Sequence, residues 1–143
     1  MTSKEYLNQA HQIEKRIMTK AEQIEVLRAV VTKVTTTLSK ARVQSSLSPS
    51  RMEGTIAKMI DLEEELKADM DELITTKADV TKTVRMVSDP ELQLLLEKRY
   101  LCHEKWDEIA MDMGISVQHM FRLHGEALKK VEEILKLRVN ERD

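Results

Sequence analysis

Four side chains within residues 117–122 are of the types that can read the edges of DNA bases. Arg122 can donate two hydrogen bonds to guanine, and Gln118 can bond adenine in the same bidentate way. Val117 or Phe121 can touch a thymine methyl group. The chemistry that this stretch offers is therefore readout of a major groove.

Neighbouring residues extend this candidate surface. His119 lies at its flank, Gly125 would let a phosphate approach closely, and lysines nearby are candidate phosphate contacts. The predicted DNA contacts are Ser116, Val117, Gln118, His119, Phe121, Arg122, Gly125, Lys129 and Lys105, with Lys130 as a further phosphate contact. An ordinary solvated side chain is the alternative for each of them. An exposed aromatic residue such as Phe121 is also a typical anchor of a protein interface.

The same stretch has the spacing of a helix-turn-helix. When Trp106 is position one, Ala110 is fifth, where a crossing helix requires a small residue. Gly114 is ninth, where the turn requires a positive φ, and Ser116 can cap the second helix. The anchoring positions hold Ile109, Met113, Ile115, Met120 and Leu123. The pattern predicts a helix-turn-helix, and a plain helical corner is the alternative.

The charge around this stretch argues against strong DNA binding by one copy. Residues 89–143 hold nine basic and twelve acidic side chains, a balance of −3. Residues 1–60 have ten basic and five acidic side chains, and residues 61–80 have two and eight. Because phosphate contacts supply most non-specific affinity, a dimer or a partner that already holds DNA would be needed.

Residues 3–44 have the heptad pattern of a long helix. Thr2 and Glu5 have the spacing of a capping box at its start. Lys20 fills the one missing position of the apolar row. The row consists of Tyr6, Ala10, Ile13, Ile17, Ile24, Leu27, Val31, Val34, Leu38 and Ala41. A helix about 60 Å long cannot bury its row against itself, so it requires a partner helix.

A second helix is predicted from residue 48 or 50 to about residue 87, after the loop SSLSPS. Its start is either Ser48 followed by Pro49 or the pair Ser50 and Glu53. Its apolar row consists of Met52, Ile56, Met59, Leu66, Met70, Leu73, Val80, Val84 and Val87, with Glu63 and Lys77 in the two missing positions and Ile60, Leu62 and Ile74 widening the face. A short loop between two heptad helices predicts an antiparallel hairpin. The acidic run DLEEELKADMDE is more typical of a solvated face than of a cation site.

Asp89 and Pro90 mark the start of the C-terminal part. The expected core residues of its first helix and of its closing tail are Leu92, Leu95, Leu96, Tyr100, Leu128, Val131, Ile134 and Leu135. The predicted fold is all-α: a long antiparallel coiled-coil helical hairpin over residues 1–88, which would oligomerise, followed by a small helix-turn-helix domain over residues 89–143.

Residues for catalysis or metal binding are not grouped in the sequence. The four histidines have no partner at recognised ligand spacing, and Cys102 and His103 are adjacent, so they point to different helix faces. There is no glycine-rich phosphate loop and no nucleophile elbow. Cys102 is expected to be a small buried hydrophobe. We therefore expect no enzyme activity, no cofactor and no metal.

A single cysteine allows no internal disulfide, which favours a reducing, cytoplasmic location. No apolar run approaches the roughly 20 residues that a membrane helix requires, and the N-terminus shows no signal peptide.

Residues 94–128, LLLEKRYLCHEKWDEIAMDMGISVQHMFRLHGEAL, resemble region 4 of bacterial sigma factors. RYL ends one helix, EIA lies inside the next, and GIS forms the turn. RLHGEAL has one residue more than the usual RLHRAL, and the basic residues of a sigma recognition helix are thinned. The whole chain is similar to a family of small phage- and prophage-encoded proteins through YLNQAHQIEKRI, ARVQSS and RLHGEAL. That family is related to RinA- and ArpU-type regulators of late phage transcription.

The resemblance implies a DNA-binding transcriptional regulator in the cytoplasm of a bacterial host cell. The expected partners are double-stranded DNA and a second copy of the chain, as a homodimer or higher homo-oligomer, with no membrane. One alternative is a protein-interaction module that binds RNA polymerase or a sigma factor. Another is the small DNA-recognition subunit of a phage packaging terminase.

Overall fold

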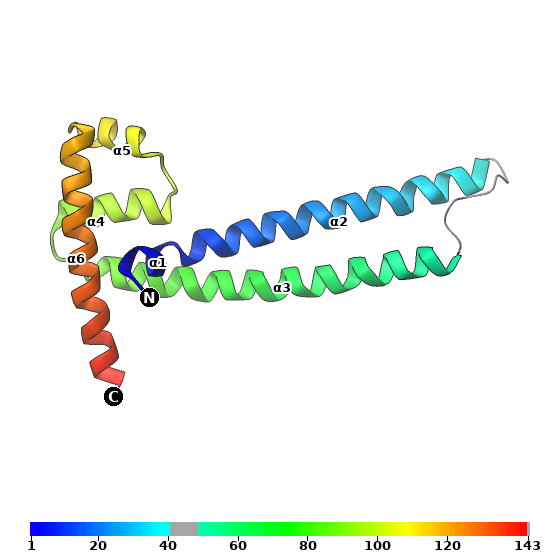
Figure 1. The fold of residues 1–143 in the computed structure, drawn as a ribbon, viewed down its shortest axis with the longest axis horizontal. Helices are drawn as coiled ribbons and strands as arrows, with labels where there is room; N and C mark the ends of the chain where they lie inside the picture. The colour runs from blue at the N-terminus through cyan, green and yellow to red at the C-terminus, as the bar shows by residue number, and fades with distance from the viewer. Residues whose placement is uncertain (41–48, 143) are drawn as a thin grey trace. The chain divides into compact units, whose positions relative to one another are not determined.

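Helices dominate the protein in the computed structural model, which describes residues 1–40 and 49–142 (Figure 1). The order is α1 (Ser3–Leu7), α2 (Gln9–Lys40), α3 (Pro49–Arg85), α4 (Pro90–Leu96), the π-helix η1 (Glu97–Leu101), α5 (Trp106–Met113) and α6 (Val117–Arg142). No strand occurs among the described residues, so the predicted all-α class is confirmed. None of the described helices is long and apolar enough to cross a membrane.

The chain divides into two compact units. One consists of Met1–Gln12 and Leu73–Asp143, and the other of Ile13–Glu72. The boundary expected at residue 88 therefore falls inside the first unit, because residues from α1 and the end of α3 share its core with the C-terminal helices.

The second unit is the expected hairpin, in which α2 and α3 run antiparallel (Figure 1). Ile13 and Ile24 are buried on α2, and Ile17, Lys20 and Leu27 of the predicted row are half-buried. The predicted Val34, Leu38 and Ala41 lie outside the residues whose side chains are described. The long first helix is not continuous, since Asn8 caps α1 before α2 begins.

The predicted inner row of α3 is wrong at alternate positions. Ile56 and Met70 are 41% and 50% exposed, and Glu63 is also exposed. The less exposed row in the hairpin unit consists of Met52, Thr55, Met59, Leu62, Leu66 and Asp69. The helix therefore carries two heptad rows of mostly apolar residues, one residue apart in the sequence. Only the row with Thr55 and Asp69 packs on α2.

An ion pair distinguishes the two rows. Lys20 Nζ lies 2.6 Å from Asp69 Oδ2, and Asp69 is only 8% exposed. The hydrogen bond from Lys20 lowers the pKa of the Asp69 carboxyl below its usual value. Arg16, one turn earlier on α2, lies 3.6 Å from Asp69 Oδ1, so two cations of α2 compensate this carboxylate in the observed register.

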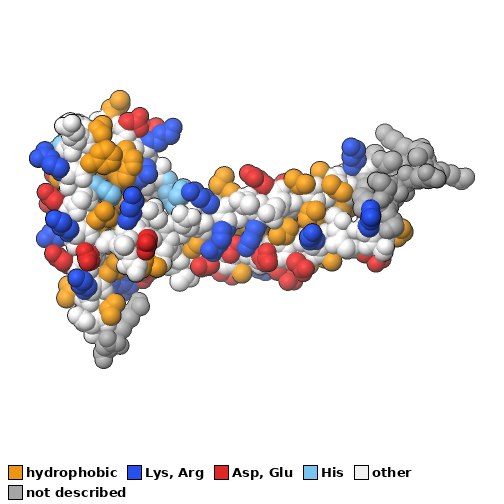
Figure 2. Space-filling model, viewed as in Figure 1, with side chains coloured by type: hydrophobic (Ala, Val, Ile, Leu, Met, Phe, Trp, Pro, Cys, Tyr) orange, Lys and Arg blue, Asp and Glu red, His pale blue; other side chains and the backbone are white. Residues whose placement is uncertain are grey.

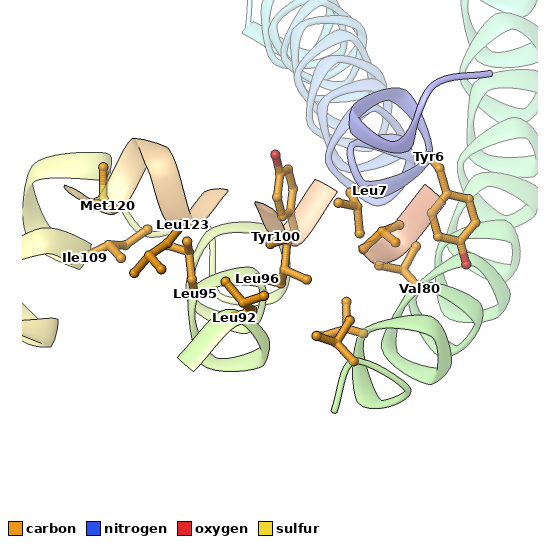
Figure 3. Close-up of a cluster of buried hydrophobic side chains, with 14 of the residues drawn as sticks. Tyr6, Leu7, Val80, Leu92, Leu95, Leu96, Tyr100, Ile109, Met120 and Leu123 are labelled. Atoms are coloured by element: carbon orange, nitrogen blue, oxygen red, sulfur yellow. The ribbon is translucent and has the colours of Figure 1, made fainter. Parts of the chain in front are cut away.

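The core of the first unit gathers apolar residues from its helices (Figure 3). Its most completely buried large side chains are Leu7, Val80, Val84, Leu95, Leu96, Ile109, Met120 and Val131. Two of the predicted helix starts are confirmed: Thr2 and Glu5 form a capping box, and Asp89 caps α4 with Pro90 in its first turn. For the helix predicted to start at Ser48 or Ser50, α3 begins at Pro49, and Ser48 lies outside the described residues.

A polar network joins α1, α3 and α6 within the same unit. Tyr6 donates its hydroxyl hydrogen bond to Asp79 on α3. Arg138 on α6 donates to Thr83 and, at 2.6 Å, to Asp79 Oδ1. Neither Arg138 nor Asp79 stands out in the sequence, because their partners are 55 or more positions away.

The link between α4 and α5 departs from a plain helix. The chain widens into the π-helix η1, and His103 follows with a φ of 57°. Cys102 is exposed, so the expectation that it is buried is wrong. The reason is its position at the C-cap of η1, beyond the last turn that packs against the core.

Candidate nucleic-acid interface

The helix-turn-helix is formed by α5, the turn at Gly114 and the start of α6. Ile109 and Met120 are fully buried, and Ala110 and Leu123 are 3% and 8% exposed. Met113 and Ile115 are partly buried and pack against the same core. All seven constrained positions, including the glycine, thus lie as their spacing predicts.

The turn provides hydrogen bonds for backbone groups at the end of α5 and the start of α6. Gly114 has a φ of 67° and a ψ of 33°, the left-handed conformation that ends many helices. Its N–H donates to the Met111 carbonyl, and the Ile115 N–H donates to Ala110, both at 3.1 Å. Ser116 Oγ accepts from the His119 N–H at 3.1 Å, which confirms Ser116 as the cap of α6.

Alanine at the two glycines of this motif should have opposite effects on stability. Gly114→Ala should lower the free energy of unfolding by about 1–2 kcal/mol, because an L side chain strains a left-handed backbone. Gly125→Ala should raise it by about 0.8–1 kcal/mol, because Gly125 lies inside α6 with open space around the added methyl. Urea denaturation of both variants measures this, and equal signs would contradict the assigned turn.

The predicted base-reading residues emerge on the first turns of α6, at the end where the helix dipole is positive. Val117 and Phe121 are 45% and 48% exposed, Gln118 and Arg122 are exposed, and His119 is half-buried. Ser116, Gly125, Lys129 and Lys105 are also exposed. The helical spacing places Gly125 and Lys129 on the same face as Arg122, whereas Lys105 precedes α5.

Arg122 is oriented by its own helix. One of its terminal nitrogens lies 3.0 Å from His119 Nδ1, a contact between residues three positions apart. This contact holds the guanidinium along the exposed face of α6. A bound base would have to replace it.

An aromatic cluster supports α6 from below this face. Arg99 lies 4.2 Å from the centre of the Trp106 ring, and Trp106 contacts the rings of Phe121 and His124 at 5.3 and 4.7 Å. Tyr100 Oη and His124 Nε2 are 2.7 Å apart. The cluster therefore ties η1 and α5 to α6, and Phe121 rests against Trp106 with about half of its surface exposed.

The two buried members of this cluster are held uncharged at neutral pH. Burial, followed by the positive charges of Lys4 and Arg99, lowers the pKa of His124 to about 4. Burial also raises the pKa of Tyr100 to about 12. Periodicity does not single out His124 or Arg99, although the i,i+3 spacing of Phe121 and His124 is a signal for a shared face.

Side chains of both charges lie on the surface around α5 and the start of α6 (Figure 2). This region carries the predicted reading face, which consists of Val117, Gln118, Phe121 and Arg122. Exposed acids on α5 include Asp107, Glu108 and Asp112, and Lys98 is 3.4 Å from Asp112. The predicted contacts Arg122, Lys129 and Lys105 therefore lie in a surface of mixed charge. Another pair that spacing could not reveal is His11 and His103, whose rings are 5.0 Å apart in the same unit.

A family model matches residues 34–132, which cover the predicted hairpin partner helix and the whole helix-turn-helix. Its description reads "Protein of unknown function (DUF1492)". No curated protein and no solved structure matches the chain significantly.

Proposed function

Because the chain belongs to the DUF1492 family, whose function is unknown, we infer its role from the site and propose that it is a phage-type transcriptional regulator that binds DNA. The start of α6 enters a major groove, and the hairpin brings two copies together. The protein acts in the cytoplasm of a bacterial cell and has no catalytic role. The proposal also holds that the protein is related to the RinA- and ArpU-type regulators of late phage transcription.

The observation that carries the proposal is that the helix-turn-helix is firmly packed on the core while polar side chains at the start of α6 are exposed. Ile109 and Met120 fix α6 to the core, while Gln118 and Arg122 are exposed one turn apart. Adenine and guanine are the bases that these two side chains bind bidentately. The two side chains are therefore free to meet base edges while α6 stays fixed to the core.

The charge of the module favours binding as a dimer. Phosphate contacts come from few lysines, and residues 89–143 have a net charge of −3. A single copy therefore gains little non-specific affinity. Two copies double the contacts and can read two half-sites.

Binding can be tested with duplexes selected from a random-sequence library and with the DNA upstream of the protein's own gene. We expect a sequence-dependent gel shift at micromolar protein that weakens as salt rises. Equal affinity for selected and scrambled duplexes, or no shift at low salt, would count against the proposal.

Arg122→Ala should weaken binding to the selected duplex by about 1–3 kcal/mol and relax preference at one base pair, because Arg122 contacts a base edge. Lys136→Ala is the matched control, since Lys136 is exposed near the end of α6 and pairs with its neighbour Glu132 at 3.6 Å. Fluorescence anisotropy on selected and scrambled duplexes measures both variants. An equal loss on the two duplexes would place Arg122 on the phosphate backbone instead.

A second candidate is a protein-interaction module that binds RNA polymerase or a sigma factor. The exposed apolar side chains of Val117, Phe121 and Met111, the last 82% exposed, favour this alternative. A pull-down of purified polymerase after nuclease treatment would support it, provided that Phe121→Ala abolishes capture and Arg122→Ala does not.

A further inference from the structure

The helix α3 carries an exposed apolar row in addition to the one that packs on α2. We call it the outer row. Its apolar members are Ile56, Ile60, Met70 and Ile74, which are 41%, 49%, 50% and 70% exposed. Hydrophobic side chains recur along the hairpin surface in Figure 2. Four large apolar residues on one helical stripe are more than scattered surface residues explain.

The outer row has heptad spacing and two charges at its centre. Its steps are four, three, four, three and four when Glu63 and Lys67, which are both exposed, are included. That alternation is the signature of a helix that packs along a second helix. Because the described part of α2 packs on the inner row, a helix that packs along the outer row would have to come from elsewhere.

The order of residues in the outer row is symmetric about Glu65. Ile56 and Ile74 are equally far from that position, and so are Ile60 and Met70. The same holds for Glu63 and Lys67, which carry opposite charges. In a second copy of α3 that runs antiparallel to the first, apolar residues of the outer row would therefore face apolar residues, and Glu63 would face Lys67.

We propose that the outer row is the interface with a second copy of this chain, in which the two α3 helices pack antiparallel across a two-fold axis at the level of Glu65. Ile60 then faces Met70 of the partner subunit, and Ile56 faces Ile74 of the partner subunit. Glu63 faces Lys67 of the partner subunit twice, once on each side of the axis. An isologous contact of this kind is the usual form of a homodimer.

The charges select the antiparallel arrangement over the parallel one. In a parallel pair, Glu63 would meet Glu63 of the partner subunit, and Lys67 would meet Lys67 of the partner subunit. Like charges at such positions are unfavourable, whereas the reversed helix brings opposite charges together. Glu63 also lies 3.6 Å from Arg28 on α2, a loose contact that keeps its carboxylate at the edge of the hairpin beside the outer row.

This inference rests only on the dimerisation in the proposed function and not on DNA binding. Its tests use the full chain without DNA. A monomer that still shifts a selected duplex would overturn the interface alone. A dimer that binds no DNA would overturn the regulator alone.

Charge reversal tests the pairing. Lys67→Glu should raise the dimer dissociation constant at least about tenfold, since it places a second carboxylate against Glu63 of the partner subunit on both sides of the axis. Glu63→Lys should act likewise, and an equimolar mixture of the two variants should recover dimers as heterodimers. Sedimentation velocity over a concentration series measures this, with circular dichroism to confirm unchanged helicity.

Lys58→Glu is the matched control, because Lys58 is exposed and lies nine residues, or half a turn in phase, from Lys67 on the same helix. It should leave dimerisation unchanged. Weakening by Lys58→Glu in place of Lys67→Glu would show that the opposite face of the hairpin is used. A wild-type protein that is monomeric at 100 µM, taken as roughly the upper limit for a specific dimer, would overturn the proposal.

Disulfide trapping tests the direction independently. In a Cys102→Ser background, the double variant Ile60→Cys with Met70→Cys should form covalent dimers on mild oxidation, and Ile60→Cys alone should not. The two cysteines are about 15 Å apart along one helix, too far to bond within a chain. Efficient trapping by the single variant would instead indicate a parallel dimer.

Discussion

Acidification from pH 7 to pH 4 should destabilise the unit that holds the helix-turn-helix by about 3 kcal/mol through His124 alone. The imidazole is 8% exposed and packs between Tyr100 and Trp106. Its pKa is about 4 in the folded protein and 6.5 in an exposed chain. A difference of this size corresponds to about 1.4 kcal/mol for each pH unit between the two values.

The sign follows from which state binds the proton. Above pH 6.5 both states are neutral at His124, and its contribution to stability is fully present. As the pH falls through 6.5, the unfolded chain takes up a proton while the folded protein does not until about pH 4. Stability from this residue therefore declines between pH 6.5 and 4 and levels off below.

His124→Gln isolates the effect, because glutamine can still hydrogen-bond the Tyr100 hydroxyl and does not titrate. Other groups also titrate below pH 5, so the quantity to measure is the difference between wild type and variant in urea denaturation at pH 7, 5.5 and 4. That difference should shrink by about 3 kcal/mol at acid pH. A constant difference would mean that His124 takes up its proton in the folded protein at the same pH as in the unfolded chain.

The helix-turn-helix could be predicted because its constraints are local. A left-handed turn at Gly114, a small residue at Ala110 and buried anchors at Ile109 and Met120 all lie within 15 residues. Each position excludes most residue types for a steric reason. The base-reading role of Gln118 and Arg122 is not constrained in this way, because an exposed face tolerates any polar residue, and it stays a prediction.

The register of the hairpin could not be predicted because α3 satisfies the heptad pattern twice. The number of apolar residues favours the row with Ile56 and Met70. In the structure, Thr55 is partly buried and Asp69 is buried in their place. The deciding contact is the ion pair of Asp69 with Lys20. Apolar periodicity disfavours an acidic residue at a buried position, and the lysine that compensates the charge lies on another helix, 49 positions away.

Contacts between distant positions are likewise beyond periodicity. The heptad pattern predicts Tyr6 only as an apolar residue in a seam, whereas its hydroxyl joins Asp79 and Thr83. Arg138 is one charge among several in a helical tail, yet its side chain is only 13% exposed. These hydrogen bonds form only when the N-terminal segment and the last helix come together in the fold. The spacing of residues within one helix cannot predict that contact.

Arg138→Met should lower the free energy of unfolding of this unit by about 2–4 kcal/mol. Methionine retains most of the buried stem but removes the donors to Asp79, Thr83 and Tyr6. Leaving a carboxylate without its cation usually costs about 3–5 kcal/mol in a protein interior. The expected value is lower here because the Asp79 side chain is 38% exposed, so water replaces part of the loss.

Arg85→Met is the matched control, since Arg85 is exposed at the end of α3, and it should change stability by less than about 0.5 kcal/mol. In a double-mutant cycle, Asp79→Asn together with Arg138→Met should cost less than the two single changes added, because no uncompensated charge is left. Additive losses would show that the pair is solvated. Since Arg138 follows Arg122 by 16 residues, about four helical turns, the ratio of affinities for selected and scrambled DNA should not change below the melting transition. A change in that ratio would mean that the network between α1 and α6 controls the reading face as well as the stability of the unit.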